Sequence, residues 1–153
     1  MQKIKIEPFQ VIGISVRTTN ENGQSAEDIG GLWQTFISEN IIEKIPNRVD
    51  DEVLSIYTNY ESDFTKPYDT ILGCRVARLD NIPEGMVGQA FTGGTYTPFL
   101  AKGDLDQGVI YKKWVEIWGQ DLGRAYTADF EIFGKKSMDR GNAEVDIMIA
   151  LDE

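Results

Sequence analysis

The pattern of hydrophobic and polar positions predicts a strand, a helix and two more strands in the first half of the chain. These elements cover residues 4–17, 26–39, 52–60 and 70–77. The helix is predicted because its apolar residues recur three or four positions apart, which places them on one helical face. The strands are predicted from apolar runs that end at polar or glycine-containing turns.

The second half of the chain repeats this order. A long strand, a helix and two strands are predicted over residues 86–101, 105–122, 126–133 and 143–151. The long strand contains Gly93 and Gly94, and glycine inside a strand marks a bend or a bulge. Both halves therefore have the order β-α-β-β, and we expect the long strand to bend at the two glycines.

An internal duplication is the simplest explanation of the repeated order. The pseudo-repeats cover residues 1–80 and 84–153, and the segment YTNYE ending at Glu61 is similar to the segment YTADFE ending at Glu131. Neither half has enough elements to cover its own apolar faces. We therefore expect the two halves to share one sheet and to form one domain over residues 1–153.

The chain is acidic, with a formal net charge of −10 over 153 residues. Contact with a nucleic-acid backbone requires clustered lysine and arginine, which the sequence lacks, so we expect no direct nucleic-acid binding. An acidic surface instead attracts cationic small molecules or basic proteins. No apolar run approaches the roughly 20 residues of a membrane helix, and the N-terminus lacks the apolar stretch of a signal peptide. We expect no membrane partner and a cytoplasmic location.

The inventory of reactive residues excludes several kinds of catalysis. The chain has no histidine and a single cysteine, Cys74. The Ser-His-Asp and Cys-His arrangements are therefore excluded, as is the side chain that most often binds transition metals. Cys74 lies in an apolar run and is interpreted as a small buried hydrophobic residue. We expect no metal site and no cofactor, so any catalysis would depend on carboxylates, tyrosine or lysine.

Glu131 lies near the middle of the predicted strand 126–133. Side chains alternate along a strand, so Glu131 shares a face with Asp129 and Phe133 and points away from Phe130. Such a carboxylate is either solvated or salt-bridged on an open face, or held in a cavity, because burying it without a partner is costly. The residues alone leave both interpretations open.

Several short segments along the chain form a set with a defined order and spacing. They are VIGISVRT (11–18), YTNYESD (57–63), GCRV (73–76), IPEG (82–85) followed by GTY (94–96), and FEIF (130–133) followed by AEVDI (143–147). Together they resemble the gyrase-inhibitor-like effector-binding domains, which form the ligand-binding half of AraC-type and MerR-type multidrug regulators and also occur as stand-alone proteins. The resemblance implies an α+β fold with a six-stranded, barrel-like antiparallel sheet, helices on one side and a concave pocket between the halves.

The resemblance also implies which residues bind a ligand. In the multidrug-binding members a buried glutamate lies at the floor of the pocket among aromatic rings and neutralises lipophilic cations, and this glutamate matches Glu131. Many relatives have tyrosine two residues later, where this chain has Phe133 without the hydroxyl group. The spacing of Trp33, Trp114 and Trp118 also fits a helix core. We expect the ligand-binding residues to be Glu131, Phe133, Tyr57, Tyr96, Trp33 and Trp118.

Three functions are compatible with these observations. We expect a stand-alone small-molecule binding protein, related to the ligand domains of bacterial transcription regulators, that takes amphipathic, aromatic or cationic compounds over Glu131. One alternative is a hydrolase of reactive cyclopropane-type electrophiles, with Glu131 as the general base and Tyr57 or Tyr96 polarising the substrate. The other is an acidic protein-interaction module of the gyrase-inhibitor type. We favour a binding protein over an enzyme.

Overall fold

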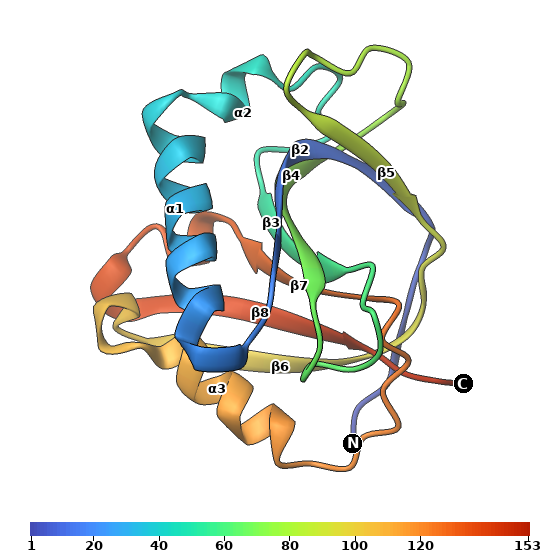
Figure 1. The fold of residues 1–153 in the computed structure, drawn as a ribbon, viewed down its shortest axis with the longest axis vertical. Helices are drawn as coiled ribbons and strands as arrows, with labels where there is room; N and C mark the ends of the chain where they lie inside the picture. Colours follow the sequence, from blue (N-terminus) through green and yellow to red (C-terminus); the bar gives the residue numbers. More distant parts are fainter.

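The computed structural model describes residues 1–153 and has an α+β architecture, with one curled antiparallel sheet and two main helices (Figure 1). Eight strands form the sheet in the order β1-β6-β8-β7-β3-β4-β2-β5. Their bounds are Ile4–Ile6 (β1), Phe9–Thr18 (β2), Val53–Thr58 (β3), Tyr68–Val76 (β4), Val87–Phe91 (β5), Gly94–Gly103 (β6), Ala128–Phe133 (β7) and Ala143–Ala150 (β8). The helices are Gln24–Ser38 (α1), Ile41–Lys44 (α2) and Val109–Trp118 (α3), with 3-10 turns at Glu21–Gly23, Leu105–Gln107, Lys135–Ser137 and Arg140–Asn142.

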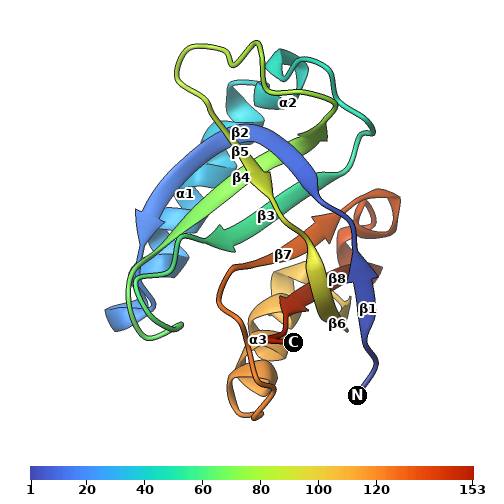
Figure 2. The same cartoon turned by 90° about the vertical axis from the view of Figure 1, so that its right-hand side faces the viewer.

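Two units of the same topology share the sheet. The first consists of β2, α1, β3 and β4, and the second of β6, α3, β7 and β8, so the β-α-β-β order predicted for each half is present. The units meet where β3 pairs antiparallel with β7, at the centre of the sheet (Figure 2). Within this pair Ser55 lies directly opposite Glu131. Glu131 is therefore at the seam between the two halves.

The prediction of six strands is wrong, because each of the two long predicted strands is divided by a bend. Pro8 separates β1 from β2, and proline has no N–H to donate to a sheet. Gly93 and Gly94 separate β5 from β6 with φ angles of 71° and 128°, a backbone conformation that favours glycine. A Cβ at Gly93 would also lie 2.1 Å from the carbonyl oxygen of Ile6.

The two bends exchange strand segments between the halves. The segment β1 leaves its own unit and pairs with β6, and β5 leaves its unit and pairs with β2. The bend predicted at Gly93 and Gly94 is therefore present, and its consequence is a sheet of eight strands that curls at both ends. This curl encloses a core that the simple β-α-β-β description does not contain.

One of the two predicted helices agrees with its predicted range, and the other is shorter than predicted. Helix α1 matches the predicted range within two residues at each end. The second predicted helix, 105–122, is interrupted at Gly108, which has a φ of 71°, and ends at Trp118. The short helix α2 was not expected from the sequence. None of the helices has the length and apolar character of a membrane span.

Three hydrophobic clusters hold the sheet and helices together. One lies between α1, α2 and the strands β2 and β4; a second lies between α3 and the strands β6 and β8; the third lies inside the curl of the sheet. Helix α1 packs mainly on β2 and β4, and α3 packs on β6. Each helix thus covers the outer strands of its own half. The helix-side face of the central pair, β3 and β7, is left open between them.

Candidate ligand-binding site

A cavity of about 1650 Å³ lies between α1 and α3, above the central strands β3 and β7. This volume exceeds the roughly 300–1,000 Å³ of most sites for drug-sized ligands, so a bulky organic molecule can be accommodated. Eighteen of its 34 lining residues are hydrophobic. The large apolar side chains Ile37, Tyr111 and Met138 line it and are exposed to solvent. The cavity is therefore both wide and largely apolar.

Glu131 is buried in the wall of this cavity, with 3% of its surface exposed. Its Oε2 atom accepts two hydrogen bonds, from the Tyr57 hydroxyl at 2.9 Å and from the Trp114 indole N–H at 2.6 Å. No group of the protein donates a hydrogen bond to Oε1, and this atom is not fully enclosed. One carboxylate oxygen is thus held in place, and the other is free to meet a ligand.

Burial raises the pKa of Glu131 from its usual 4.5 to about 7. The hydrogen bonds from Trp114 and Tyr57 favour the ionised form and oppose this shift, but they do not cancel it. Near neutral pH the side chain therefore exchanges between a neutral acid and an anion. A positively charged ligand in the cavity would favour the anion.

Substitution of Trp114 by phenylalanine is expected to raise the pKa of Glu131 further above 7. The change removes the N–H donor at 2.6 Å, which stabilises the ionised carboxylate more than the neutral acid. The measurement is a pH titration of the Glu131 side-chain carbon by NMR. The matched control is Trp118→Phe, which alters an indole in the same cavity that forms no bond to Glu131. An unchanged or lower pKa in Trp114→Phe would contradict the role of this hydrogen bond.

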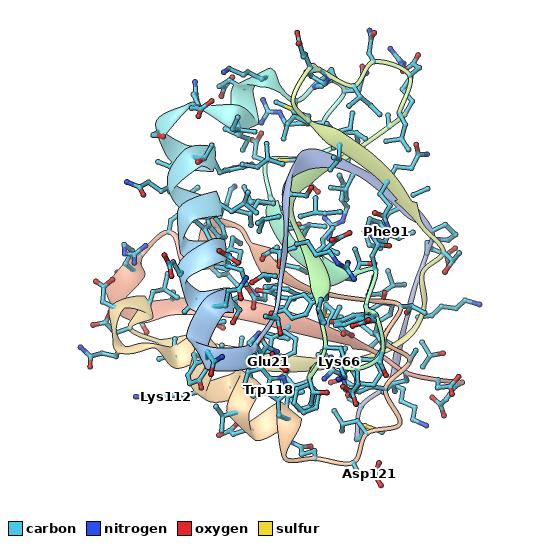
Figure 3. All side chains as sticks on the ribbon, viewed as in Figure 1. Glu21, Lys66, Phe91, Lys112, Trp118 and Asp121 are labelled. Carbon is cyan, nitrogen blue, oxygen red and sulfur yellow. The ribbon has the colours of Figure 1, made fainter.

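Five of the six residues predicted from the sequence line the cavity. Trp33 from α1 contacts Phe133 from β7, with ring centroids 4.8 Å apart, and joins the two walls across the open face. Trp118 stacks on Phe64 of the loop between β3 and β4 at 5.5 Å, and Figure 3 labels it at the end of α3. Tyr57 completes the set through its bond to Glu131. Whether these residues bind a ligand stays a prediction.

The sixth predicted residue, Tyr96, lies outside the cavity. Its ring packs against Phe130 in the core inside the curl of the sheet, and its hydroxyl donates to the carbonyl of Ala128 at 2.9 Å. Tyr96 is 2% exposed. The bend at Gly94 sets which face of β6 each side chain occupies, and the sequence pattern does not reveal this orientation. Tyr96 is therefore removed from the candidate site.

Two other expectations about the central strands need correction. The sequence echo matched Glu61 with Glu131, but Glu61 is exposed beyond the end of β3, and the residue opposite Glu131 is Ser55. Regular alternation along a strand would also place Tyr60 and Tyr57 on opposite faces, yet both line the cavity. The reason is Asn59, which has a φ of 51° and interrupts the alternation of the strand.

A second carboxylate, that of Asp129, lies behind the cavity wall and is not among the residues predicted for the site. Asp129, two residues before Glu131, is fully buried and forms a salt bridge of 2.8 Å with Arg124. Strand alternation places Asp129 on the same face as Glu131, but nothing in the sequence identifies Arg124 as its partner. Trp114 belongs to the core cluster under α3, as its helical spacing indicated, and its indole N–H also reaches Glu131. A buried indole N–H requires a hydrogen-bond acceptor, and this requirement was the one sequence clue to the contact between Trp114 and Glu131.

The hydroxyl groups that the hydrolase alternative requires are already engaged. The Tyr57 hydroxyl proton is donated to Glu131, and the Tyr96 hydroxyl is donated to a backbone carbonyl on the other face of the sheet. Neither group is free to polarise a substrate carbonyl above Glu131. The geometry therefore offers a base without the helper that this reaction was expected to use.

A family model described as Cass2, integron-associated effector binding protein, matches residues 4–151. The chain belongs to this family. A crystal structure of the Vibrio cholerae integron cassette protein VCH_CASS2 is 34% identical, and the match covers 97% of this chain and 94% of that one with a TM-score of 0.74. The resemblance to effector-binding domains inferred from the sequence motifs is thereby confirmed.

More distant relatives connect the family to transcription regulation. YobU of Bacillus subtilis (strain 168), named as a candidate transcriptional regulator, is 24% identical over 143 residues, which span 91% of this chain and 89% of YobU. The structure of SAV2435 bound to tetraphenylphosphonium shares the fold, with a TM-score of 0.79 at 17% identity over 97% of this chain and 91% of that one. The chain is thus a member of an effector-binding family that is related to transcription regulators.

Proposed function

We propose that this protein binds amphipathic aromatic cations and that Glu131 neutralises their positive charge. The observation that carries the proposal is a buried carboxylate without a counter-ion. Both hydrogen-bond partners of Glu131 are neutral, and Glu131 takes part in none of the salt bridges in the protein. An uncompensated buried charge is costly, and a bound cation removes that cost.

The walls of the cavity suit the rest of such a ligand. Aromatic rings attract cations through their π-faces, and Tyr57, Trp114 and Phe133 surround the carboxylate or share its strand face. The apolar lining favours a hydrophobic ligand body. The net charge of −10 attracts cations toward the surface before they enter.

The structure of SAV2435 with tetraphenylphosphonium supports this choice of ligand class. Its identity of 17% extends only to a shared fold, so the cation is carried over as a proposal. Tetraphenylphosphonium is bulky, aromatic and permanently charged. A cavity of about 1650 Å³ accommodates a molecule of this kind.

The proposal is tested with two ligands of nearly equal size and shape and opposite charge. Tetraphenylphosphonium is expected to bind at least about 100-fold more tightly than tetraphenylborate, because the anion would approach a buried carboxylate. Isothermal titration calorimetry at pH 8 and at moderate salt measures both affinities. Equal affinities, or tighter binding of the borate, would show that the cavity does not select positive charge.

A further inference from the structure

The carboxylate of Asp129 lies on the same face of β7 as Glu131 but differs from it in every contact. Its Oδ1 atom accepts the backbone N–H of Ala150 at 2.8 Å. Its Oδ2 atom accepts the Tyr60 hydroxyl at 2.7 Å and Nη2 of Arg124 at 2.8 Å. Asp129 is fully buried, and both of its oxygens are occupied. The Asp129 carboxylate lies behind the cavity wall and has all its contacts within the protein, whereas Glu131 lines the cavity and has one oxygen without a donor.

Arg124 is held in the way that aromatic binding sites hold a ligand cation. Its guanidinium carbon lies 4.4 Å from the centre of the Tyr126 ring, 5.8 Å from that of Phe64 and 5.9 Å from that of Trp114. These distances fall within the range of cation–π contacts. The side chain is 5% exposed, and its Nε and Nη1 atoms have no hydrogen-bond partner. A carboxylate and aromatic rings, not a full set of hydrogen bonds, hold this cation.

The two carboxylates are neighbours on one strand: Glu131 lines the cavity, and Asp129 lies behind the wall, paired with Arg124, which also lines the cavity. Alternate residues of a strand are about 7 Å apart on the same face. Trp114 connects them, because its N–H donates to Glu131 while its ring lies against the guanidinium of Arg124. Arg124, Asp129 and Glu131 belong to the same structural unit, since the arginine precedes β7 and both carboxylates are on it. The two carboxylates thus define two adjacent positions for a cation, and Arg124, which lines the cavity, occupies the one next to Asp129.

We propose that Arg124 permanently fills one of two cation positions in the cavity and so restricts the ligand to a single positive charge. The inference rests on the proposed function of Glu131 and adds a selectivity that Glu131 alone does not explain. A ligand with a second charge about 7 Å from the first would meet the guanidinium and be repelled. Without the arginine, Asp129 would be free to accept that second charge.

The test uses two fluorescent dyes with the same phenanthridinium ring, the monocation ethidium and the dication propidium. The measured quantity is the ratio of their dissociation constants, propidium over ethidium, from fluorescence titration. Arg124→Met keeps an apolar stem and removes the charge. We expect the ratio to fall at least about tenfold in this variant, because propidium gains the Asp129 carboxylate as a partner.

Two controls separate this effect from a general change of charge. Arg78→Met gives the same change in net charge at an exposed arginine outside the cavity, and it should leave the ratio at the wild-type value. The double variant Arg124→Met/Asp129→Asn removes both charges of the pair and should restore that value. A fall of the same size in Arg78→Met would assign the effect to the surface field and overturn the inference.

If Arg124→Met does not fold, the variant Asp129→Asn tests the inference instead. It leaves the guanidinium uncompensated in the cavity, so the ratio of propidium to ethidium dissociation constants should rise instead of fall. An unchanged ratio in every folded variant that still binds ethidium contradicts the inference alone. Failure of the wild-type protein to bind either dye contradicts the proposed function and the inference together.

Discussion

Glu131→Gln is expected to weaken the binding of tetraphenylphosphonium by about 100-fold at pH 8. A single charge pair at about 4 Å contributes on the order of 4 kcal/mol at an effective dielectric constant of 20, and part of it is offset by desolvation. A net loss of about 2.7 kcal/mol corresponds to the expected factor. Glutamine retains the shape and the polar contacts of the side chain, so the loss reports the charge.

The same substitution is expected to stabilise the fold at pH 8 by up to about 3 kcal/mol, since one unit of pKa shift corresponds to about 1.4 kcal/mol. The estimate follows from the rise of the Glu131 pKa from 4.5 to about 7 on burial. Urea unfolding measures the stability, and calorimetry measures the binding. Opposite signs for the two effects indicate a residue kept for binding at the expense of stability.

Asp121→Asn is the matched control for this experiment. It removes one negative charge from an exposed position outside the cavity, at the lower edge of Figure 3. Affinity for tetraphenylphosphonium and stability should both stay close to the wild-type values. If Asp121→Asn weakens binding as much as Glu131→Gln, the general acidic field, not the buried carboxylate, governs the affinity.

The affinity for tetraphenylphosphonium should fall by about 100-fold between pH 8 and pH 5. The ligand keeps its charge throughout this range, so a change in affinity must come from titration of a group in the protein. Below the Glu131 pKa of about 7 the free site is protonated and has to release its proton before it pairs with a cation, which costs a factor of about ten per pH unit. Calorimetry at pH 6 in buffers of different ionisation enthalpy should detect the release of close to one proton.

The pH dependence of stability has a defined sign. Folded Glu131 binds its proton more tightly than unfolded Glu131, so its contribution to stability is fully present below pH 4.5 and is lost as the pH rises through about 7. Glu131→Gln should remove this dependence together with the pH dependence of binding. A pH profile of binding that persists in Glu131→Gln would assign the titration to another group.

Local sequence patterns locate most helices and strands, but they do not determine which strand side chains face the cavity. The stripe of Trp33 and its neighbours identifies α1 because helical periodicity is a property of adjacent residues. The same patterns do not give the orientation of Tyr96 or Tyr60, because it depends on backbone bends at Gly94 and Asn59. A single residue with positive φ changes which side chains face the cavity. Alternation along the sequence does not record such a change.

The charge balance of the site depended on contacts between distant segments. Glu131 receives its hydrogen bonds from Tyr57, 74 positions earlier, and from Trp114 on α3. Asp129 meets Arg124, only five positions earlier, but Arg124 is itself placed by a backbone bridge to Leu151 near the end of the chain. The identity of each residue was visible in the sequence. Which carboxylate was closed and which was open was not.

The sequence by itself determined the duplicated β-α-β-β order, the amphipathic helices and the membership of an effector-binding family, because these depend on local periodicity and on motif order. Only the tertiary structure decided that two bent strands are exchanged between the halves to give eight strands. It also decided that each helix covers only its own half. The seam at β3 and β7 consequently lies at the floor of the cavity between the helices. Side chains from both halves bury Glu131 there and raise its pKa, while Arg124 neutralises Asp129. These properties arise from packing between distant parts of the chain, which no local pattern contains.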